Sequence, residues 1–389
     1  MLAFRPLSLR YKRIGVPRMK SRQAQTEGYM LRLERLKKSI AVNGLEGMIL
    51  VPGPNLRYYT GVNSLLLERP FLFFVSKEGD PHLVAPALES GPYLTNPIHM
   101  AVHSWDDGSG PRNAIERAVQ QIGIRGKWGL EGRVPYQYIS AFLKSSQPQL
   151  ENAESILQGI RARKEPGEIK LLQQAALVLS KAFLKIPHML KPGMTELELA
   201  RKASEEIRRN GAESVEDMLV QSGAMAAHCH HLPSAKRINR NESIVVDASC
   251  TFSGYFADIT RTFIIGKDPT FENMYRKVLD AQISAISASQ QGVTVGSIDQ
   301  AARNRLHQDG FDKYFVHRTG HGLGLEVHEA PYIVPGGSEI VHASMVFTVE
   351  PGVYIEGKTG IRIEDDIVVT KQGRKVLTKV VPKEFGWWR

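Results

Sequence analysis

The alternation of apolar and polar positions predicts a buried β-hairpin in the second half of the chain. Residues 244–246 form an apolar run that is typical of a buried strand, and Asp247 follows at its predicted end. The next apolar segment has a period of two, which places Asp258 and Thr260 on one face of a strand. Residues 253–254 are Ser-Gly, a turn signal between the two segments. We therefore expect a hairpin with both aspartates near its mid-line.

Two more apolar strands are predicted near the C-terminus, and each is associated with a glutamate. Residues 346–349 precede Glu350, and the predicted strand 361–369 contains Glu364. Helical spacing of apolar residues predicts four helices in the same half of the chain, at 169–183, 195–210, 270–289 and 297–309. Thr195 and Glu198 form a capping-box pattern at the second of these helices.

Helical and strand patterns alternate in the first third of the chain, which indicates an α/β domain. The predicted elements are a helix at 33–41, strands at 48–51, 71–75 and 82–85, a turn-rich loop at 52–61 and a helix at 113–122. The charged, Pro- and Gly-containing stretch 158–167 is the predicted boundary. The expected fold class is α/β (α+β), with domains at 28–158 and 165–389 after an extension at 1–27.

The net charge of +10 does not predict a nucleic-acid partner once it is located along the chain. Seven of the 50 basic residues fall within residues 1–22, which contain no acidic residue, so the remainder has a net charge of about +3. An Arg-rich leader of this kind is interpreted as a disordered or mis-called extension, with an organellar transit peptide as the alternative. Met19 and Met30 are alternative start positions.

Other features of the composition limit the class of protein. No run of apolar residues is long enough to span a membrane, so no membrane partner is expected. The two cysteines, Cys229 and Cys250, cannot form a disulfide framework. We interpret them as small buried residues in a reducing compartment, which favours a cytoplasmic location.

Four carboxylates and one histidine make up the candidate chemistry: Asp247, Asp258, His321, Glu350 and Glu364. Taken singly, an aspartate at a strand end is more often a cap or turn residue than a ligand. Together, however, four ionised carboxylates in a protein interior require a counter-charge. Two divalent cations would neutralise them, and an oxygen-rich ligand set with one imidazole favours manganese or cobalt over zinc. Two such ions roughly 3.5–4 Å apart would activate a shared water as a hydroxide nucleophile.

The same five positions, by residue type, order and spacing, resemble the pita-bread metallopeptidases (the creatinase/aminopeptidase P/prolidase-type M24 family). The resemblance covers residues 28–380, with Xaa-Pro dipeptidases and Xaa-Pro aminopeptidases as the most similar members. It implies a creatinase-like N-terminal domain followed by a pita-bread catalytic domain. It also implies that Asp258 and Glu364 bridge the two metal ions. Asp247 would then complete one ion, and His321 with Glu350 the other.

The resemblance also assigns further catalytic positions. His230 would contact the substrate or move a proton, although the adjacent His231 is an alternative in this histidine-rich stretch. His328 would hydrogen-bond the substrate carbonyl and the tetrahedral intermediate, while Glu350 would act as general base as well as ligand. His317 is expected to be structural.

Arg362 lies two positions before Glu364, hence on the same strand face if that strand is regular. It is expected to screen a bridging carboxylate or to bind a substrate carboxylate. The histidine-rich loop departs from the family pattern, with Met225 in place of Asn, Cys229 in place of Pro and Ala235 in place of Asp. These changes leave the substrate preference open.

The predicted function is therefore a dinuclear metallopeptidase that hydrolyses Xaa-Pro bonds in dipeptides or short peptides through a metal-bridging hydroxide. One alternative is a metal-dependent hydrolase of a small non-peptide amide, as in creatinase-like or ectoine-hydrolase-like relatives. Another is a non-catalytic pita-bread binding protein. A homodimer is expected. The sequence does not decide between dipeptidase and aminopeptidase, nor does it identify the native metal.

Overall fold

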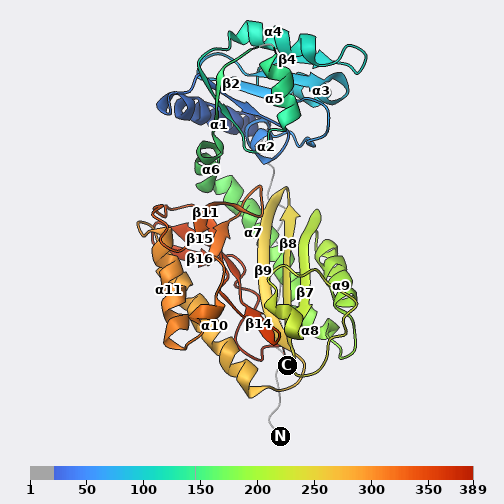
Figure 1. The fold of residues 1–389 in the computed structure, drawn as a ribbon, viewed down its shortest axis with the longest axis vertical. Coiled ribbons are helices and arrows are strands. Elements are labelled where there is room, and N and C mark those ends of the chain that lie inside the picture. The colour runs from blue at the N-terminus through green and yellow to red at the C-terminus, as the bar shows by residue number, and fades with distance from the viewer. Residues whose placement is uncertain (1–21, 145, 389) are drawn as a thin grey trace. The chain divides into compact units, whose positions relative to one another are not determined.

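The structure is a computed structural model that describes residues 22–144 and 146–388. The chain divides into two compact units, the first ending at Glu154 and the second beginning at Ser155 (Figure 1). Residues 1–21 of the predicted extension 1–27 lie outside the described residues. Its remaining part, 22–27, belongs to helix α1 (Arg22–Val42), so the prediction of disorder was wrong there. The good helix formers of this stretch continue directly into the apolar stripe of the helix.

The first unit is built on a six-stranded mixed sheet with strand order β4-β3-β2-β1-β5-β6. Its strands are β1 (Gly47–Leu50), β2 (Leu72–Ser76), β3 (His82–Pro86), β4 (Ala101–Trp105), β5 (Lys127–Leu130) and β6 (Gln149–Asn152). Its other helices are α2 (Pro54–Thr60), α3 (Ala87–Leu94), α4 (Arg112–Ile122) and α5 (Tyr136–Leu143). The predicted strands are confirmed to within a residue or two, and β2 and β3 pair antiparallel. The mixed α/β fold class is also confirmed.

The stretch 52–61 was predicted as a turn-rich loop, and that prediction was wrong because it contains helix α2. Pro54 occupies the start of the helix, where its missing N–H removes no hydrogen bond. Gly61 ends it with φ of 75°, and its N–H donates to the Arg57 carbonyl at 2.8 Å. Proline and glycine therefore mark the two ends of a short helix here.

Glu131 is a buried carboxyl group that follows β5 directly. It accepts hydrogen bonds from the Val51 N–H at 3.0 Å and from the Asn55 amide at 2.8 Å. Burial outweighs these bonds and raises the pKa of Glu131 to about 7. The folded chain therefore binds this proton more tightly than the unfolded chain.

Glu131 should make stability fall as the pH rises. Its contribution is fully present below the ordinary pKa of 4.5 and is lost as the pH rises through about 7, because the folded state then has to bury a charge. Glu131→Gln removes this titration, so its free energy of unfolding relative to the wild type should be higher at pH 8 than at pH 5. The gain should reach up to about 3 kcal/mol in urea unfolding. The exposed Glu78→Gln control should show the same difference at both pH values, and a pH-independent Glu131→Gln difference would contradict the assignment.

The second unit contains three sheets, with orders β7-β8-β9, β11-β10-β12-β15-β16 and β13-β14. Its first strands are β7 (Ser214–Ser222), β8 (Ser243–Phe252), β9 (Tyr255–Ile264), β10 (Gly320–Gly322) and β11 (Glu329–Ile333). They are followed by β12 (Val346–Val349), β13 (Gly352–Ile355), β14 (Thr359–Arg362), β15 (Asp365–Thr370) and β16 (Gly373–Val376). Its helices are α6 (Glu154–Ala162), α7 (Pro166–Phe183), α8 (Ile186–Met189), α9 (Glu196–Arg209), α10 (Pro269–Ala288) and α11 (Val295–Gln308), with 3₁₀ turns η1 (Gly223–Ala227) and η2 (Asp312–Tyr314).

The helices of this unit cover the sheets from outside. Helix α7 packs on β8 and β9, and α9 packs on β7 (Figure 1). Helices α10 and α11 pack on each other, and α11 also contacts β11. Thr195 accepts from the Glu198 N–H at 3.1 Å, which confirms the predicted capping box. Among the described residues, no helix is both long enough and apolar enough to cross a membrane.

The predicted hairpin is confirmed as β8 and β9, which pair along their full length. Ser253 and Gly254 turn the chain with φ of 51° and 76°. Asp247 is not at the end of its strand, as the apolar run had suggested, but in the middle of β8. The strand continues because residues 248–252 still pair with β9 on one side and mostly with β7 on the other.

One other prediction about this unit was wrong. The single strand expected at 361–369 is two strands, because β14 pairs with β13 whereas β15 pairs with β12. The chain changes sheets at Ile363 and Glu364, and the Glu364 N–H donates to the Thr260 carbonyl at 3.1 Å. The charged stretch 158–167, predicted as the boundary, includes the end of α6 and the start of α7.

Candidate metal centre

Five strands or strand ends deliver the predicted ligands to one place in the second unit. Asp258 in β9, His321 in β10 and Glu364 between β14 and β15 are all buried, and their ligand atoms lie within 4.8 Å of one another. Strand β9 contributes its aspartate because the period of two points Asp258 and Thr260 the same way. The three donors converge from segments that are far apart in the sequence.

Glu350 joins this group through the histidine. Its Oε1 lies 3.2 Å from the His321 Nε2 and accepts a hydrogen bond from the Thr348 hydroxyl at 3.2 Å. The other ring nitrogen of His321, Nδ1, lies 3.1 Å from the Gly322 carbonyl oxygen. That contact leaves Nε2 as the nitrogen directed at the carboxylates.

Asp247 lies on the neighbouring strand, where it pairs in register with Thr260. Its Oδ2 accepts a hydrogen bond from Arg362 at 2.6 Å, and its charge acts on both Asp258 and Glu364. The structure thus brings all five predicted positions together. The ligand atoms of Asp258, His321 and Glu364 lie within 4.8 Å of one another, and Glu350 and Asp247 lie next to them.

The electrostatics of the site are those of several carboxylates buried close together. Burial, followed by the charges of Glu364 and Asp247, raises the pKa of Asp258 well above its usual range. Burial, followed by the charges of Glu350 and Asp247, does the same to the pKa of Glu364. Only strong cationic neutralisation would let both groups ionise at neutral pH.

Glu350 behaves in the opposite way. Burial alone would raise its pKa, but the hydrogen bond and charge of His321, followed by the charges of His317 and Arg362, lower the pKa of Glu350 to about 2. Glu350 is thus the carboxylate of this group that is already ionised. Burial raises the pKa of Asp247, although the charge of Arg362 opposes the shift.

These residues fit divalent cations. Four carboxylates and one imidazole form an oxygen-rich donor set that suits hard divalent ions, and the carboxylates with raised pKa values would need a nearby cation to ionise. The cysteines take no part in the ligand set: both thiols are free, and Cys250 is buried elsewhere, against the Ala175 carbonyl.

Arg362 differs from its predicted role. It is buried, and it donates to the Asp247 carboxylate, to the Tyr354 hydroxyl at 2.8 Å and to the Thr260 hydroxyl at 3.2 Å. It does not share a regular strand face with Glu364, because β14 ends at Arg362. The carboxylate that it neutralises is Asp247 rather than either expected bridging group. His317 supports the same chain of bonds, with its Nε2 lying 2.9 Å from the Tyr354 hydroxyl.

His328 lies next to the site on the loop between β10 and β11. Its ring centroid is 4.2 Å from that of His321 in an edge-to-face arrangement, and its side chain is only partly exposed. Partial burial, followed by the charges of His321 and Arg318, lowers the pKa of His328 to about 4. It is therefore neutral at physiological pH and able to donate one hydrogen bond.

His230 lies on the loop after η1 and is exposed. The preceding turn η1 lies against β14, because Gly360 is in close contact with the Ala226 carbonyl. Among the described residues, no hydrogen bond is formed by the His230 ring, whereas the neighbouring rings of His228 and His231 contact each other at 6.5 Å. The thiol of Cys229 lies near the Tyr354 hydroxyl and Arg362.

Sequence reasoning missed several residues that hold the ligands. Thr260 donates to Glu364 at 2.6 Å, and Asp366 accepts from the Asp258 N–H at 3.1 Å. The period of two on β9 was a usable signal for Thr260, since it shares a face with Asp258. Tyr354 and Asp366 gave no such signal, because their partners are more than a hundred residues away or on another strand.

The fold and this site define a two-domain metallopeptidase of the pita-bread class. The sequence matches metallopeptidase family M24 over residues 170–371 and the creatinase/prolidase N-terminal domain over residues 32–163. The probable dipeptidase PepE of Mycobacterium bovis is 33% identical over 360 residues, which cover 91% of this chain and 96% of that protein. The chain therefore belongs to metallopeptidase family M24 and is a peptidase.

Solved structures agree with this assignment. A dipeptidase from Pyrococcus horikoshii superimposes with a TM-score of 0.87 at 34% identity, covering 91% of this chain and 99% of that one. An Xaa-Pro dipeptidase from Bacillus anthracis gives a TM-score of 0.85 at 30% identity, covering 92% and 99%. The predicted family and fold are thus confirmed, and the family implies divalent metal ions at the buried site.

Proposed function

We propose that the protein is a dinuclear metal-dependent peptidase that hydrolyses Xaa-Pro bonds in dipeptides or short peptides. The observation that carries the proposal is the buried convergence of Asp258, His321 and Glu364, with Glu350 and Asp247 adjoining them. Support for the substrate class comes from relatives named dipeptidase and Xaa-Pro dipeptidase, which are 33% and 30% identical to this chain.

Within this proposal, Asp258 and Glu364 would hold both ions, with Asp247 as a further ligand of one and His321 and Glu350 of the other. Manganese or cobalt suits the oxygen-rich set, and zinc is the alternative. Two bound ions would supply Lewis-acid polarisation of the scissile carbonyl and an activated water. Substrate binding and proton transfer would be carried out by side chains of the protein.

The side chains around the ligands would bind the substrate and move protons. Glu350, held ionised by His321, is placed to accept the proton of the attacking water. Neutral His328 would donate a hydrogen bond to the oxygen of the carbonyl as negative charge develops on it. His230, on the loop next to β14, would serve the departing proline nitrogen.

Arg362 would act through Asp247 rather than on a substrate carboxylate. Its guanidinium is fully engaged by Asp247, Tyr354 and Thr260, which leaves it buried and fixed. Its charge offsets that of one carboxylate in a site with four. This favours a role in orienting Asp247 and in limiting the repulsion that the metal ions must overcome.

The alternatives differ in what the site would do with the same ligands. A hydrolase of a small non-peptide amide would use the same activated water. The two activities would therefore differ only in the loop that binds the substrate, where Met225, Cys229 and Ala235 depart from the family pattern. A non-catalytic binding protein is disfavoured because the full ligand set is present. A homodimer and a cytoplasmic location remain part of the proposal, and two free cysteines are consistent with the latter.

Metal-depleted protein reconstituted with manganese or cobalt should bind close to two ions per chain by elemental analysis after gentle desalting. The reconstituted protein should cleave Ala-Pro or Arg-Pro-Pro and leave creatine intact. Ala-Pro cleavage alone indicates a dipeptidase, and Arg-Pro-Pro cleavage indicates an aminopeptidase. A metal content near zero without activity would overturn the proposal in favour of a binding protein, and creatine turnover would favour the small-amide hydrolase.

A further inference from the structure

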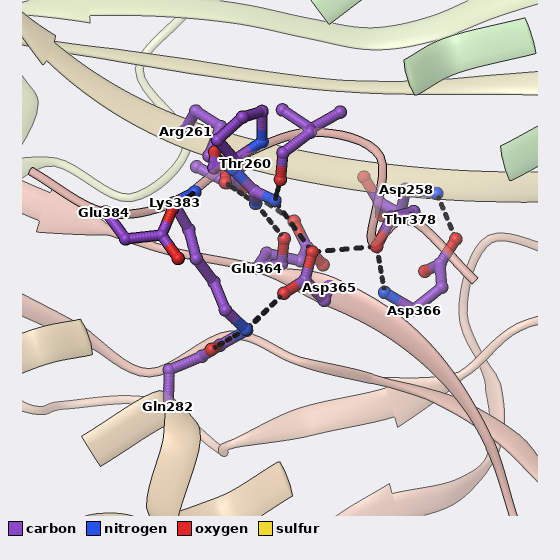
Figure 2. Close-up of polar contacts among 12 residues, drawn as sticks. Asp258, Thr260, Arg261, Gln282, Glu364, Asp365, Asp366, Thr378, Lys383 and Glu384 are labelled. Carbon is purple, nitrogen blue, oxygen red and sulfur yellow. Dashed lines mark hydrogen bonds and ion pairs between the residues drawn. The ribbon is translucent and has the colours of Figure 1, made fainter. Parts of the chain in front are cut away.

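A buried network of charged and polar groups contacts the residues that flank the ligands. It connects them to the C-terminal segment 378–383, here called the tail. Its centre is Asp365, the residue after Glu364, which is 1% exposed and surrounded by Arg261, Gln282, Thr378 and Lys383 (Figure 2). We propose that Lys383 and Arg261 are positioning residues, which through Asp365 hold the two expected bridging carboxylates, Asp258 and Glu364, in the geometry that retains the metal ions. The inference rests on the proposed two-metal site and deepens it.

Arg261 connects three segments of the chain. It is fully buried, with its guanidinium donating to the Asp365 carboxylate at 2.8 Å and to the backbone carbonyl of Glu364. It also donates to the carbonyls of Val381 and Pro382 at 2.9 and 3.1 Å. One cation thereby fixes the backbone of a ligand residue against the tail of the chain.

Asp365 is held from the other side by the tail and by helix α10. The Lys383 ammonium lies 2.8 Å from its Oδ2, and the Gln282 amide donates to the same oxygen at 2.9 Å. Thr378 donates to Oδ1 at 2.8 Å, and Lys383 also donates to the Gln282 side-chain oxygen at 2.7 Å. Both oxygens of this buried carboxylate therefore depend on tail residues.

The same tail reaches Asp258 through Asp366. The Thr378 hydroxyl accepts from the Asp366 N–H at 3.2 Å, and the Asp366 carboxylate accepts from the Asp258 N–H at 3.1 Å (Figure 2). The backbones of both Asp258 and Glu364 are thus fixed by residues whose partners lie in 378–383. A shift of the tail would be transmitted to both ligands rather than to one.

Loss of Lys383 would leave the Oδ2 of Asp365 with only the Gln282 amide. A buried carboxylate that loses a charge-assisted bond has to reorient or recruit another partner. Either change pulls on Arg261 and on the Glu364 carbonyl that Arg261 holds. Partners of this kind behind metal ligands typically alter metal affinity 10–100-fold. Lys383 is the suitable position to test, because its side chain is 21% exposed whereas Arg261 and Asp365 are wholly buried.

The test is metal retention by full-length Lys383→Met, measured well below its unfolding temperature. Manganese- or cobalt-loaded protein is mixed with a chelator, and both the dissociation constant and the half-time of metal loss are followed. We expect binding to weaken about tenfold, which corresponds to about 1.4 kcal/mol. Lys383→Arg should restore binding to within a few-fold of the wild type. The matched control is Lys379→Met, an exposed lysine of the same tail, which should leave metal binding unchanged.

The outcomes separate positioning from plain stability. A tail that only stabilises the fold would lower the unfolding temperature of metal-free and metal-loaded Lys383→Met by the same amount, with an unchanged dissociation constant; that result would overturn the inference. A smaller metal-induced rise in unfolding temperature for Lys383→Met than for Lys379→Met would support it. If the wild type binds no metal, the proposed function fails and the inference with it. If the wild type binds two ions and Lys383→Met keeps them equally well, only the inference fails.

Discussion

Asp258→Asn should abolish peptidase activity and bring the metal content well below two ions per chain. Asp258 is buried beside Glu364 and His321, and as a bridging ligand it would contact both ions. The amide removes one negative charge from the site and offers one coordinating oxygen in place of two, so both ions are held less tightly. The loss should exceed the roughly 10–100-fold that removal of an outer partner costs. Elemental analysis and peptide hydrolysis on one preparation measure both quantities.

The control for this substitution is Asp312→Asn, since Asp312 is exposed and pairs with the exposed His307. It should keep both metal ions and full activity. Because Asp258 has a raised pKa in the metal-free protein, Asp258→Asn should still fold, and circular dichroism should be unchanged. Retention of two ions with near-normal turnover would show that Asp258 is not a bridge.

His328→Ala should lower kcat by about 10²–10³ and leave the metal content near two, since this is the usual effect of losing one donor to a developing oxyanion. The ring lies 4.2 Å from His321 between centroids, close to the site but outside the group of converging ligand atoms. KM should change less than kcat, because the bond matters mainly once negative charge has formed on the substrate oxygen. Steady-state kinetics and metal analysis measure the two parts separately.

The low pKa of His328, about 4, adds a further condition to this prediction. The neutral ring should act as donor across the neutral pH range, so the variant should be slower by a similar factor at each pH above about 6. His342→Ala, which removes an exposed histidine, should leave kcat unchanged. Loss of one metal ion would make His328 a ligand, and an unchanged kcat would remove it from the catalytic residues.

The hairpin of β8 and β9 was predictable because its pattern is local. An apolar run, a Ser-Gly turn and a period of two are enough to define two paired strands and the face that carries Asp258 and Thr260. The capping box of α9 was readable for the same reason, since both of its partners lie within one turn. The first unit was less predictable, because α2 is a seven-residue helix whose proline and glycine resemble loop signals.

The positions of Arg362 and Glu364 could not be read from periodicity. A continuous apolar stretch predicts one strand, but hydrogen bonding to two different partners divides it into β14 and β15. The break turns Arg362 towards Asp247, a residue 115 positions earlier in the chain. Pairing between distant strands is a property of the folded chain, and no local pattern specifies it.

By itself, the sequence determined the types, order and spacing of the five candidate ligands, together with the strands that hold Asp258 and Glu350. Those features depend on residue chemistry and on periodicities of a few residues, which are present before folding. Only the tertiary structure decided that Arg362 neutralises Asp247 and that Lys383 and Arg261 hold Asp365 and the Glu364 backbone. Each of these contacts joins a charged or polar group to a partner that becomes its neighbour only when distant strands pair and exclude water from the space between them.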